Sequence, residues 1–182
     1  MLKKSQKVAI YMEGHIYSEY GKMGMGVLRY LENEIVCVID KKYSNTNIDD
    51  HYSNLKTVPV VNDLESAIKL GAEVLILGIA PSGGKVPSDW YPIIKMALSK
   101  GLSIINGLHD LLQNRFSNLI SKTNQWIWDV RVPNFVPEIA TGKAAKLNNK
   151  RLLMVGTDMA CGKMTTALEV LTWSKENKLK SG

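Results

Sequence analysis

Short apolar runs recur along the first two thirds of the chain, and segments with helical character separate them. The runs are KVAIYM at 7–12, EIVCVID at 34–40, EVLILGIA at 73–80 and LSIINGL at 102–108. Strands that are buried on both faces of a parallel sheet have this composition. Helices are predicted at 25–33, 64–71 and 89–101. Because strands and helices alternate at short spacing, the sequence predicts an α/β fold with a parallel sheet covered on both faces.

Turn and cap residues set the predicted boundaries. Asn62 or Asp63 is expected to cap the helix that ends at Gly71, and Pro92 fits the first turn of the helix that ends at Gly101. The polar stretch 41–56 is interpreted as a loop. Brief strands are predicted at 58–61 (VPVV), within QWIWDVRVP at 125–133, and at 151–155 (RLLMV).

The segment before the last of these strands divides the chain. Residues 133–150 contain two prolines, a glycine and many polar residues, which is typical of a linker. We therefore predict a first domain at 1–132, a linker at 133–150 and the beginning of a second domain at 151–182. One strand and one helix cannot bury both faces of a parallel strand, so we expect this second domain to be incomplete. The chain is then an N-terminal fragment, or a truncated or split gene product.

Composition limits the classes of partner. Of the 182 residues, 45% are hydrophobic and 22% are charged, which is ordinary for a soluble protein. No apolar stretch is long enough for a membrane span, no secretory signal is present, and two cysteines do not indicate a disulfide framework. The net charge of +6 comes mainly from lysines without interleaved aromatic residues, so it is interpreted as a solvated surface and not as a nucleic-acid interface. A cytoplasmic protein without membrane or nucleic-acid partners is predicted.

The stretch MVGTDMACGKMTTALEV at 154–170 carries the clearest chemistry. Gly156 follows an apolar run, and Gly162 and Lys163 open a helix. Backbone N–H groups, the positive end of a helix and a lysine together bind phosphates. The predicted phosphate-binding residues are Gly156, Thr157, Asp158, Met159, Ala160, Cys161, Gly162, Lys163, Met164 and Thr165. The alternative is a glycine-rich strand-to-helix turn without a ligand.

This loop departs from the common phosphate-loop pattern in two ways. Five residues separate Gly156 from Gly162, one more than usual, as in dethiobiotin synthetase-like P-loop enzymes, which the loop resembles. Met164 stands where a serine or threonine would bind Mg²⁺. Thr165 is a possible Mg²⁺ ligand, although one residue turns a helical side chain by about 100°. Phosphate binding, with ATP or acetyl-CoA as the ligand, is therefore better supported than Mg²⁺-dependent hydrolysis.

Further candidates follow the predicted strands, where open α/β sheets bind ligands. Gly14, in a glycine-rich turn, and Asp40, at a strand end, suggest a dinucleotide site, although the glycine order differs from the usual fingerprint. Ordinary turn glycines or another phosphate-bearing ligand are the alternatives. Gly83, Gly84 and Lys85 follow the strand at 73–80, and His109 follows the strand at 102–108. The three histidines are scattered, so no metal site is predicted.

Four of these stretches occur in an order and spacing that resemble one known family. They are LGIAPSGGKVPSDW, GLSIINGLHDLL, IWDVRVP and VGTDMACGKMTTALEV. The chain resembles the domain-of-unknown-function 1611 family, also called the D-glutamate N-acetyltransferase-like family. The resemblance implies a Rossmann-like N-terminal domain followed by the first strand and helix of a P-loop NTPase-like domain. Gly83, Gly84, His109, Asp129 and Arg131 match stretches that recur in that family.

The resemblance also implies an activity, because one branch of the family acylates the amino group of D-glutamate with acetyl-CoA. On this hypothesis the protein is a transferase acting on a small amino acid, and His109 or a carboxylate of the first domain handles the amine proton. The alternatives are an ATP-dependent ligase, a nicotinamide-dependent oxidoreductase, and a non-catalytic binding module or fragment. A homo-oligomer, or a partner chain that completes the second domain, is also considered.

Overall fold

A computed structural model describes residues 2–133, 135–136, 138–158 and 161–182. The chain forms two compact units, Met1–Asn134 and Phe135–Gly182, which are described separately below as unit 1 and unit 2. The division falls at the beginning of the segment that the sequence predicts as a linker.

Unit 1 is built on a six-stranded parallel sheet with the strand order β3-β2-β1-β4-β5-β6. The strands are β1 (Val8–Tyr11), β2 (Ile35–Ile39), β3 (Val60–Val61), β4 (Val74–Leu77), β5 (Ser103–Asn106) and β6 (Ile127–Asp129). Each lies within a run that the sequence predicts as a strand, so the predicted parallel α/β fold is confirmed. The order of strands reverses between β1 and β4, and open sheets of this kind bind ligands beyond the carboxyl ends of their strands at such a point.

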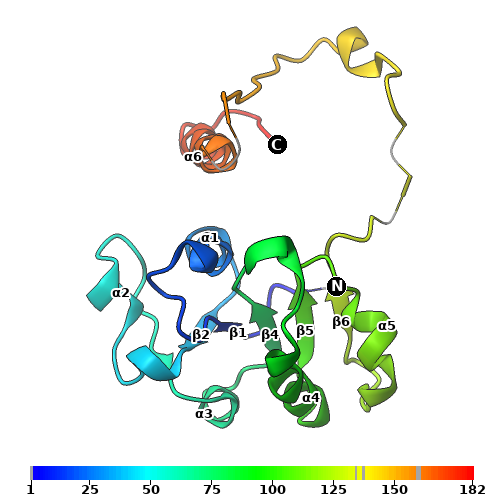
Figure 1. Cartoon of the computed structure of the whole chain (residues 1–182). Coiled ribbons are helices and arrows are strands. Elements are labelled where there is room, and N and C mark those ends of the chain that lie inside the picture. Colours follow the sequence, from blue (N-terminus) through cyan, green and yellow to red (C-terminus); the bar gives the residue numbers. More distant parts are fainter. Residues whose placement is uncertain (1, 134, 137, 159–160) are drawn as a thin grey trace. The chain divides into compact units, whose positions relative to one another are not determined.

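Helices cover both faces of this sheet, as Figure 1 shows for α1 on one face and for α3 and α4 on the other. The helices of unit 1 are α1 (Lys22–Tyr30), α2 (Ile48–His51), α3 (Leu64–Lys69), α4 (Tyr91–Ser99) and α5 (Leu112–Phe116). Buried residues of α3, α4 and α5 pack in one hydrophobic cluster, and buried residues of α1 and α2 pack in the other. The sheet is therefore the middle layer of three.

The ends of α3 and α4 follow from cap chemistry. The Asp63 carboxylate accepts a hydrogen bond from the Ser66 N–H at 2.7 Å, which satisfies one of the free donors at the start of α3. Gly71 and Gly101 lie just after α3 and α4 with φ of 89° and 86°, a conformation that favours glycine. Pro92 stands in the first turn of α4, as predicted.

Helix α1 approaches the end of β4 closely. The Gly24 N–H donates to the Gly78 carbonyl oxygen at 2.7 Å. A Cβ atom on Gly78 would lie 3.0 Å from the Gly24 Cα atom and 2.6 Å from a methyl group of Ile10, and a Cβ atom on Gly24 would lie 2.5 Å from the Met12 sulfur. These two glycines therefore allow the helix to sit directly over the point where the strand order reverses.

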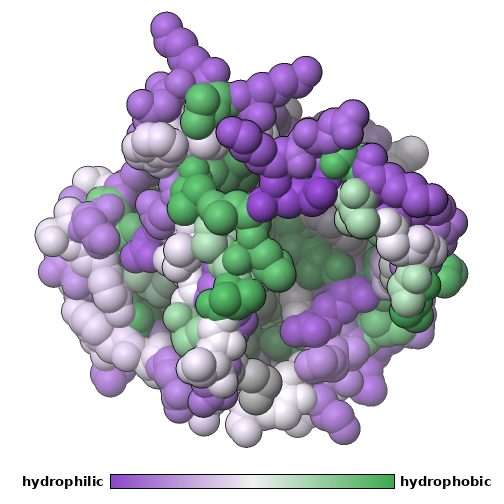
Figure 2. All heavy atoms as spheres, turned by 90° about the horizontal axis from the view of Figure 1, so that it is seen from above, coloured by the Kyte–Doolittle hydropathy of each residue, from purple (hydrophilic) through white to green (hydrophobic). Residues whose placement is uncertain are grey.

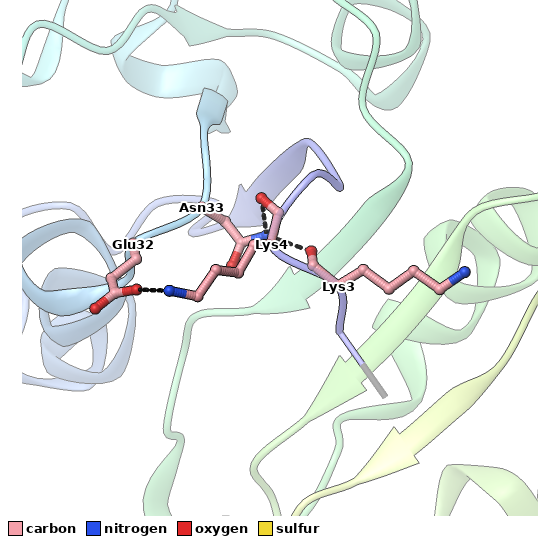
Figure 3. Close-up of polar contacts among 4 residues, drawn as sticks. All are labelled: Lys3, Lys4, Glu32 and Asn33. Atoms are coloured by element: carbon pink, nitrogen blue, oxygen red, sulfur yellow. Dashed lines mark hydrogen bonds and ion pairs between the residues drawn. The ribbon is translucent and has the colours of Figure 1, made fainter.

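The amino-terminal segment is held at the opposite edge of the sheet. The Asn33 side-chain amide, just before β2, donates to the carbonyl oxygens of Lys3, Lys4 and Gln6 at 2.8, 3.2 and 2.9 Å. Lys4 also pairs with Glu32 at 2.8 Å (Figure 3). Both charged groups are exposed, so the Asn33 bonds and not the ion pair fix this segment.

One element of unit 1 differs from the expectation. The stretch 41–56, predicted as a loop, contains the short helix α2. A capping box begins this helix, because the Asn47 N–H donates to the Asp50 carboxylate at 2.7 Å and the Asn47 side chain accepts in return. A capping box usually has Glu or Gln at the third helical position, and the aspartate made the signal less visible.

Unit 2 has one long helix, α6 (Lys163–Glu176), and a 3-10 turn at Lys143–Lys146 within the predicted linker. The strand predicted at 151–155 is not formed among the described residues, and Leu152, Leu153 and Val155 are 75%, 80% and 79% exposed. A strand is defined by a paired neighbour, and the described part of unit 2 offers none. Figure 2 shows one face of the molecule, on which exposed hydrophobic residues lie among hydrophilic ones.

No helix in the described part of the chain combines the length and the apolar character needed to cross a membrane.

Candidate phosphate-binding loop and sheet-edge site

The start of α6 has backbone features that favour an anion. Gly162, directly before the helix, has φ of 91°, which favours glycine, and its carbonyl oxygen accepts the first helical bond from the Thr166 N–H at 2.9 Å. The N–H groups of the first turn of a helix have no partner within it. In a helix of 14 residues they combine with the helix dipole to favour an anion at this end.

The Lys163 side chain folds back over the loop. Its ammonium group donates to the Asp158 carbonyl oxygen at 2.5 Å and lies 3.3 Å from the Cys161 sulfur. A Cβ atom on Gly156 would lie 2.3 Å from that sulfur, so the loop can close in this form only with glycine at 156. The single positive charge of the loop is thus held by neutral groups, which a phosphate oxygen would replace with a charge-assisted bond.

The residues after Lys163 are turned in different directions. Met164 is 76% exposed, and its thioether is not a ligand that Mg²⁺ prefers. The Thr166 hydroxyl donates to the Gly162 carbonyl oxygen at 3.1 Å, whereas Thr165 is exposed and its hydroxyl has no partner among the described residues. Thr165 stays the predicted Mg²⁺ ligand. Met159 and Ala160 lie outside the described residues, and Thr157 is exposed.

Two loops after β4 and β5 brace each other at the carboxyl edge of the sheet in unit 1. The His109 N–H donates to the Gly84 carbonyl oxygen at 2.8 Å, and the Asp110 carboxylate accepts from the Val86 N–H at 2.6 Å. Gly84 has φ of 65°, and a Cβ atom there would lie 2.2 Å from the His109 ring. The His109 side chain is exposed and its ring nitrogens have no partner among the described residues.

Gly83 and Lys85 lie beside this contact. Gly83 has φ of 76°, and its Cα faces open space. Lys85 is exposed and unpaired within the described part of the chain. Both remain candidates for ligand contact, because glycine permits close approach of a ligand to the backbone and lysine supplies a positive charge.

Asp129 has a structural role. It is 7% exposed, and its carboxylate accepts from the Asn106 amide at 2.8 Å and from the Leu112 and Gln113 N–H groups at 3.1 and 2.9 Å. These bonds join β5 and β6 to the start of α5. Arg131 donates from Nε to the Gly107 carbonyl oxygen at 2.8 Å and is otherwise exposed. The Asp129 oxygens thus accept hydrogen bonds within the protein, whereas the remaining N–H groups of the Arg131 guanidinium are available to a ligand.

Gly14 and Asp40 follow β1 and β2. Gly14 has φ of 71° and open space around it. Asp40 is completely buried, and one of its oxygens accepts from the Lys42 N–H at 3.0 Å while the other has no hydrogen-bond partner. Two other glycines of this stretch serve packing: a Cβ atom on Gly21 would lie 2.0 Å from the His15 carbonyl oxygen, and one on Gly24 would lie 2.5 Å from the Met12 sulfur. Close contacts within the protein thus explain Gly21 and Gly24, but not Gly14 or Gly26.

A pocket of about 360 Å³ lies beside the carboxyl ends of β1, β2 and β3, and none of the predicted site residues lines it. Its acidic lining residues include Glu13, which follows β1, and Asp63, which follows β3. Their positions directly after predicted strands could have indicated a ligand site. Acidic residues are also common at the starts of helices for capping alone, so these positions did not distinguish a ligand site from a helix cap.

Comparison with known proteins places the chain in a family. Residues 41–133 match the family described as "Domain of unknown function (DUF1611_N) Rossmann-like domain". Residues 138–182 match "Domain of unknown function (DUF1611_C) P-loop domain". The chain belongs to the DUF1611 family. A Rossmann-like domain followed by a P-loop domain is therefore the organisation of this DUF1611 chain, and the resemblance noted from its motifs is confirmed.

Two curated relatives carry the same name. A protein named D-glutamate N-acetyltransferase from Pseudoalteromonas sp is 45% identical over 116 residues, which are 62% of the DUF1611 chain and 34% of that protein. A second protein of this name, from Tritonibacter scottomollicae, is 38% identical over 120 residues, which are 65% of this chain and 35% of that protein. The chain spans about a third of the length of these relatives.

A solved structure supports the fold. The crystal structure of a DUF1611 family protein from Anabaena variabilis matches with a TM-score of 0.88 and 39% identity. The match covers 95% of this chain and 51% of that one.

Proposed function

We propose that this DUF1611 protein is an N-acetyltransferase that uses acetyl-CoA to acylate the amino group of a small amino acid, with D-glutamate as the first substrate to test. The names of two relatives with 45% and 38% identity carry this proposal. The start of α6 supports it, because the N–H groups of the first helical turn and the Lys163 ammonium suit the phosphates of CoA. A cytoplasmic location fits a reaction that consumes acetyl-CoA.

The proposed reaction needs no metal ion. The substrate amine attacks the thioester carbonyl carbon, a C–N bond forms, and the C–S bond breaks with release of CoA thiolate. A base removes the proton that the attacking amine loses, and the thiolate takes up a proton. His109 is our candidate for this base, because its ring is exposed and unpaired within the described residues. Mg²⁺, with Thr165 as its ligand, would be required only if the loop bound ATP.

The direct test measures CoA release from acetyl-CoA and D-glutamate, alongside ADP release from ATP. The proposal expects CoA release without ADP. ADP release that depends on the amino acid, without CoA release, would show a ligase instead.

Two substitutions test the residues proposed for acetyl-CoA binding and for proton removal. We expect Lys163→Ala to weaken acetyl-CoA binding about tenfold or more, because a charge-assisted bond to phosphate is lost. Lys175→Ala is the matched control, since Lys175 is an exposed lysine near the other end of α6. Substitution of His109 by alanine should lower kcat by about 10²–10⁴ with little effect on acetyl-CoA affinity. Equal acetyl-CoA affinity in the two lysine variants would reject the phosphate-loop interpretation.

A further inference from the structure

The acidic pocket beside β1, β2 and β3 shares no residue with the phosphate loop. It has a volume of about 360 Å³, within the range of small-molecule sites, roughly 300–1,000 Å³. The ends of β1 and β2 and the first turns of α3 and α4 form its wall. All its lining residues belong to unit 1, and none is among the residues that the sequence analysis predicted for ligand binding.

The lining of the pocket carries negative charge. Four carboxylates line it, and the lining contains no lysine, arginine or histidine: Glu13, Asp63, Glu65 and Asp89. Glu13 and Asp63 each accept a hydrogen bond from a backbone N–H, at 3.0 and 2.7 Å. Glu65 and Asp89 make no hydrogen bond or ion pair with any described residue. Two of the four carboxylates therefore have no structural partner and remain available to a ligand.

The side chain of Tyr11 also lines this pocket, and its hydroxyl has no partner among the described residues. Tyr11 is 8% exposed, its ring packs edge-on against Trp90 at 5.5 Å between centroids, and it lines the pocket. Its hydroxyl makes no hydrogen bond with any described residue. Burial, and then the charges of Glu13, Asp89 and Asp40, raise the pKa of Tyr11 to about 12, so the hydroxyl lies close to the carboxylates and keeps its proton. The unpartnered hydroxyl is therefore available to donate to, or accept from, a ligand atom in the pocket.

The size and lining of the pocket indicate an organic ligand and not a metal ion. Within the described ranges, no three His, Cys, Asp or Glu side chains lie close enough together to hold one ion. Ile39, Ile93 and Met96 add apolar wall between the charged groups. A ligand that satisfies both features has a positive head and an apolar stem.

We propose that this pocket binds a small organic cation, an ammonium or guanidinium group on a short apolar stem. Glu65 and Asp89 receive the positive head, Ile93 and Met96 cover the stem, and the Tyr11 hydroxyl donates to or accepts from a polar atom of the ligand. This inference goes beyond the proposed acetyl transfer. CoA phosphates and the carboxylates of glutamate are anionic, and the pocket repels both.

The test is calorimetric titration of the purified protein with agmatine, which carries a guanidinium and an ammonium on an alkyl stem. We expect saturable binding that weakens as salt is added, because exposed charges are screened. Glutarate, a dianion on a similar stem, is expected not to bind. Adenosine tests whether the carboxylates accept ribose hydroxyls of a neutral nucleoside instead, and it is also expected not to bind.

Substitutions assign the binding to this pocket. Glu65→Gln and Asp89→Asn should each weaken agmatine binding about tenfold, because each removes a charged partner. Glu19→Gln, an exposed carboxylate outside the pocket, is the matched control and should bind as the wild type does. Tyr11→Phe keeps the ring against Trp90 and should weaken binding severalfold, and thermal unfolding verifies that it remains folded.

Four outcomes would overturn the proposal. They are no agmatine binding, equal agmatine affinity in the Glu65, Asp89 and Glu19 variants, glutarate binding as tight as that of agmatine, and adenosine binding without agmatine binding. The acetyltransferase proposal is tested independently, because Lys163→Ala should leave agmatine affinity unchanged.

Discussion

Replacement of Gly24 by alanine tests whether the glycines after β1 serve packing or a ligand. A Cβ atom on Gly24 would lie 2.5 Å from the sulfur and 2.9 Å from the Cγ atom of Met12, which is completely buried. Gly26, in the same helix, provides the matched control, because a Cβ atom there has no neighbour within 4 Å. Neither glycine has a positive φ.

Both substitutions gain the preference of alanine over glycine in a helix. They differ in the cost of fitting the added methyl group into the surrounding structure. Alanine in place of glycine within a helix stabilises by about 0.5–1 kcal/mol at either position. Inserting a methyl group into a filled core costs about 1–3 kcal/mol, because side chains or backbone must move. The first term cancels between the variants, so Gly24→Ala should be less stable than Gly26→Ala by about 1–3 kcal/mol. Gly26→Ala should be slightly more stable than the wild type.

Urea unfolding followed by tryptophan fluorescence measures this difference, because Trp90 is buried in unit 1. The comparison is made without any ligand, so a role of Gly24 in phosphate binding cannot produce it. Equal unfolding free energies for the two variants, or a more stable Gly24→Ala, would refute the packing argument and return these glycines to the ligand-binding interpretation.

Two further predictions concern buried groups. Asp129→Ala should destabilise unit 1 by about 2–3 kcal/mol, because it removes a helix cap and leaves buried donors unpaired, and Asp129→Asn should recover part of the loss; an unchanged urea midpoint in both variants would show that the carboxylate is dispensable. Burial raises the pKa of the Cys37 thiol to about 12, so below that pH it stays protonated and only the exposed Cys161 should react rapidly with a disulfide reagent in the native protein. Denaturant should release the second thiol, and rapid labelling of two thiols without denaturant would contradict this.

The fold of unit 1 could be predicted because each strand is a short apolar run with a turn signal behind it. Strand order could not be predicted, since the pairing of β1 with both β2 and β4 depends on which faces the helices cover. The prediction of a strand at 151–155 was wrong for a related reason. An apolar run such as RLLMV shows that residues favour burial, but a strand also needs a neighbour to pair with.

The candidate site residues were also only partly predictable from the sequence. Gly156 and Gly162 were selected from the sequence as phosphate-loop residues, and the structure shows Gly162 with a positive φ directly before α6 and Gly156 against the Cys161 sulfur. Asp129 was selected from its motif, and only the structure shows that its oxygens are used within the protein. The acidic pocket combines residues far apart in sequence, from Glu13 to Asp89, so no local pattern could reveal it.

The Asn33 bonds to residues 3, 4 and 6 have a practical consequence for experiments on this protein. They hold the start of the chain beside the amino ends of the strands (Figure 3). The acidic pocket and His109 instead lie beyond the carboxyl ends of the strands. An affinity tag, fluorophore or sensor-chip linkage attached ahead of residue 2 will therefore leave from the edge away from these groups. Immobilised protein should present its pocket to the solution, and surface-based binding measurements become a suitable complement to calorimetry.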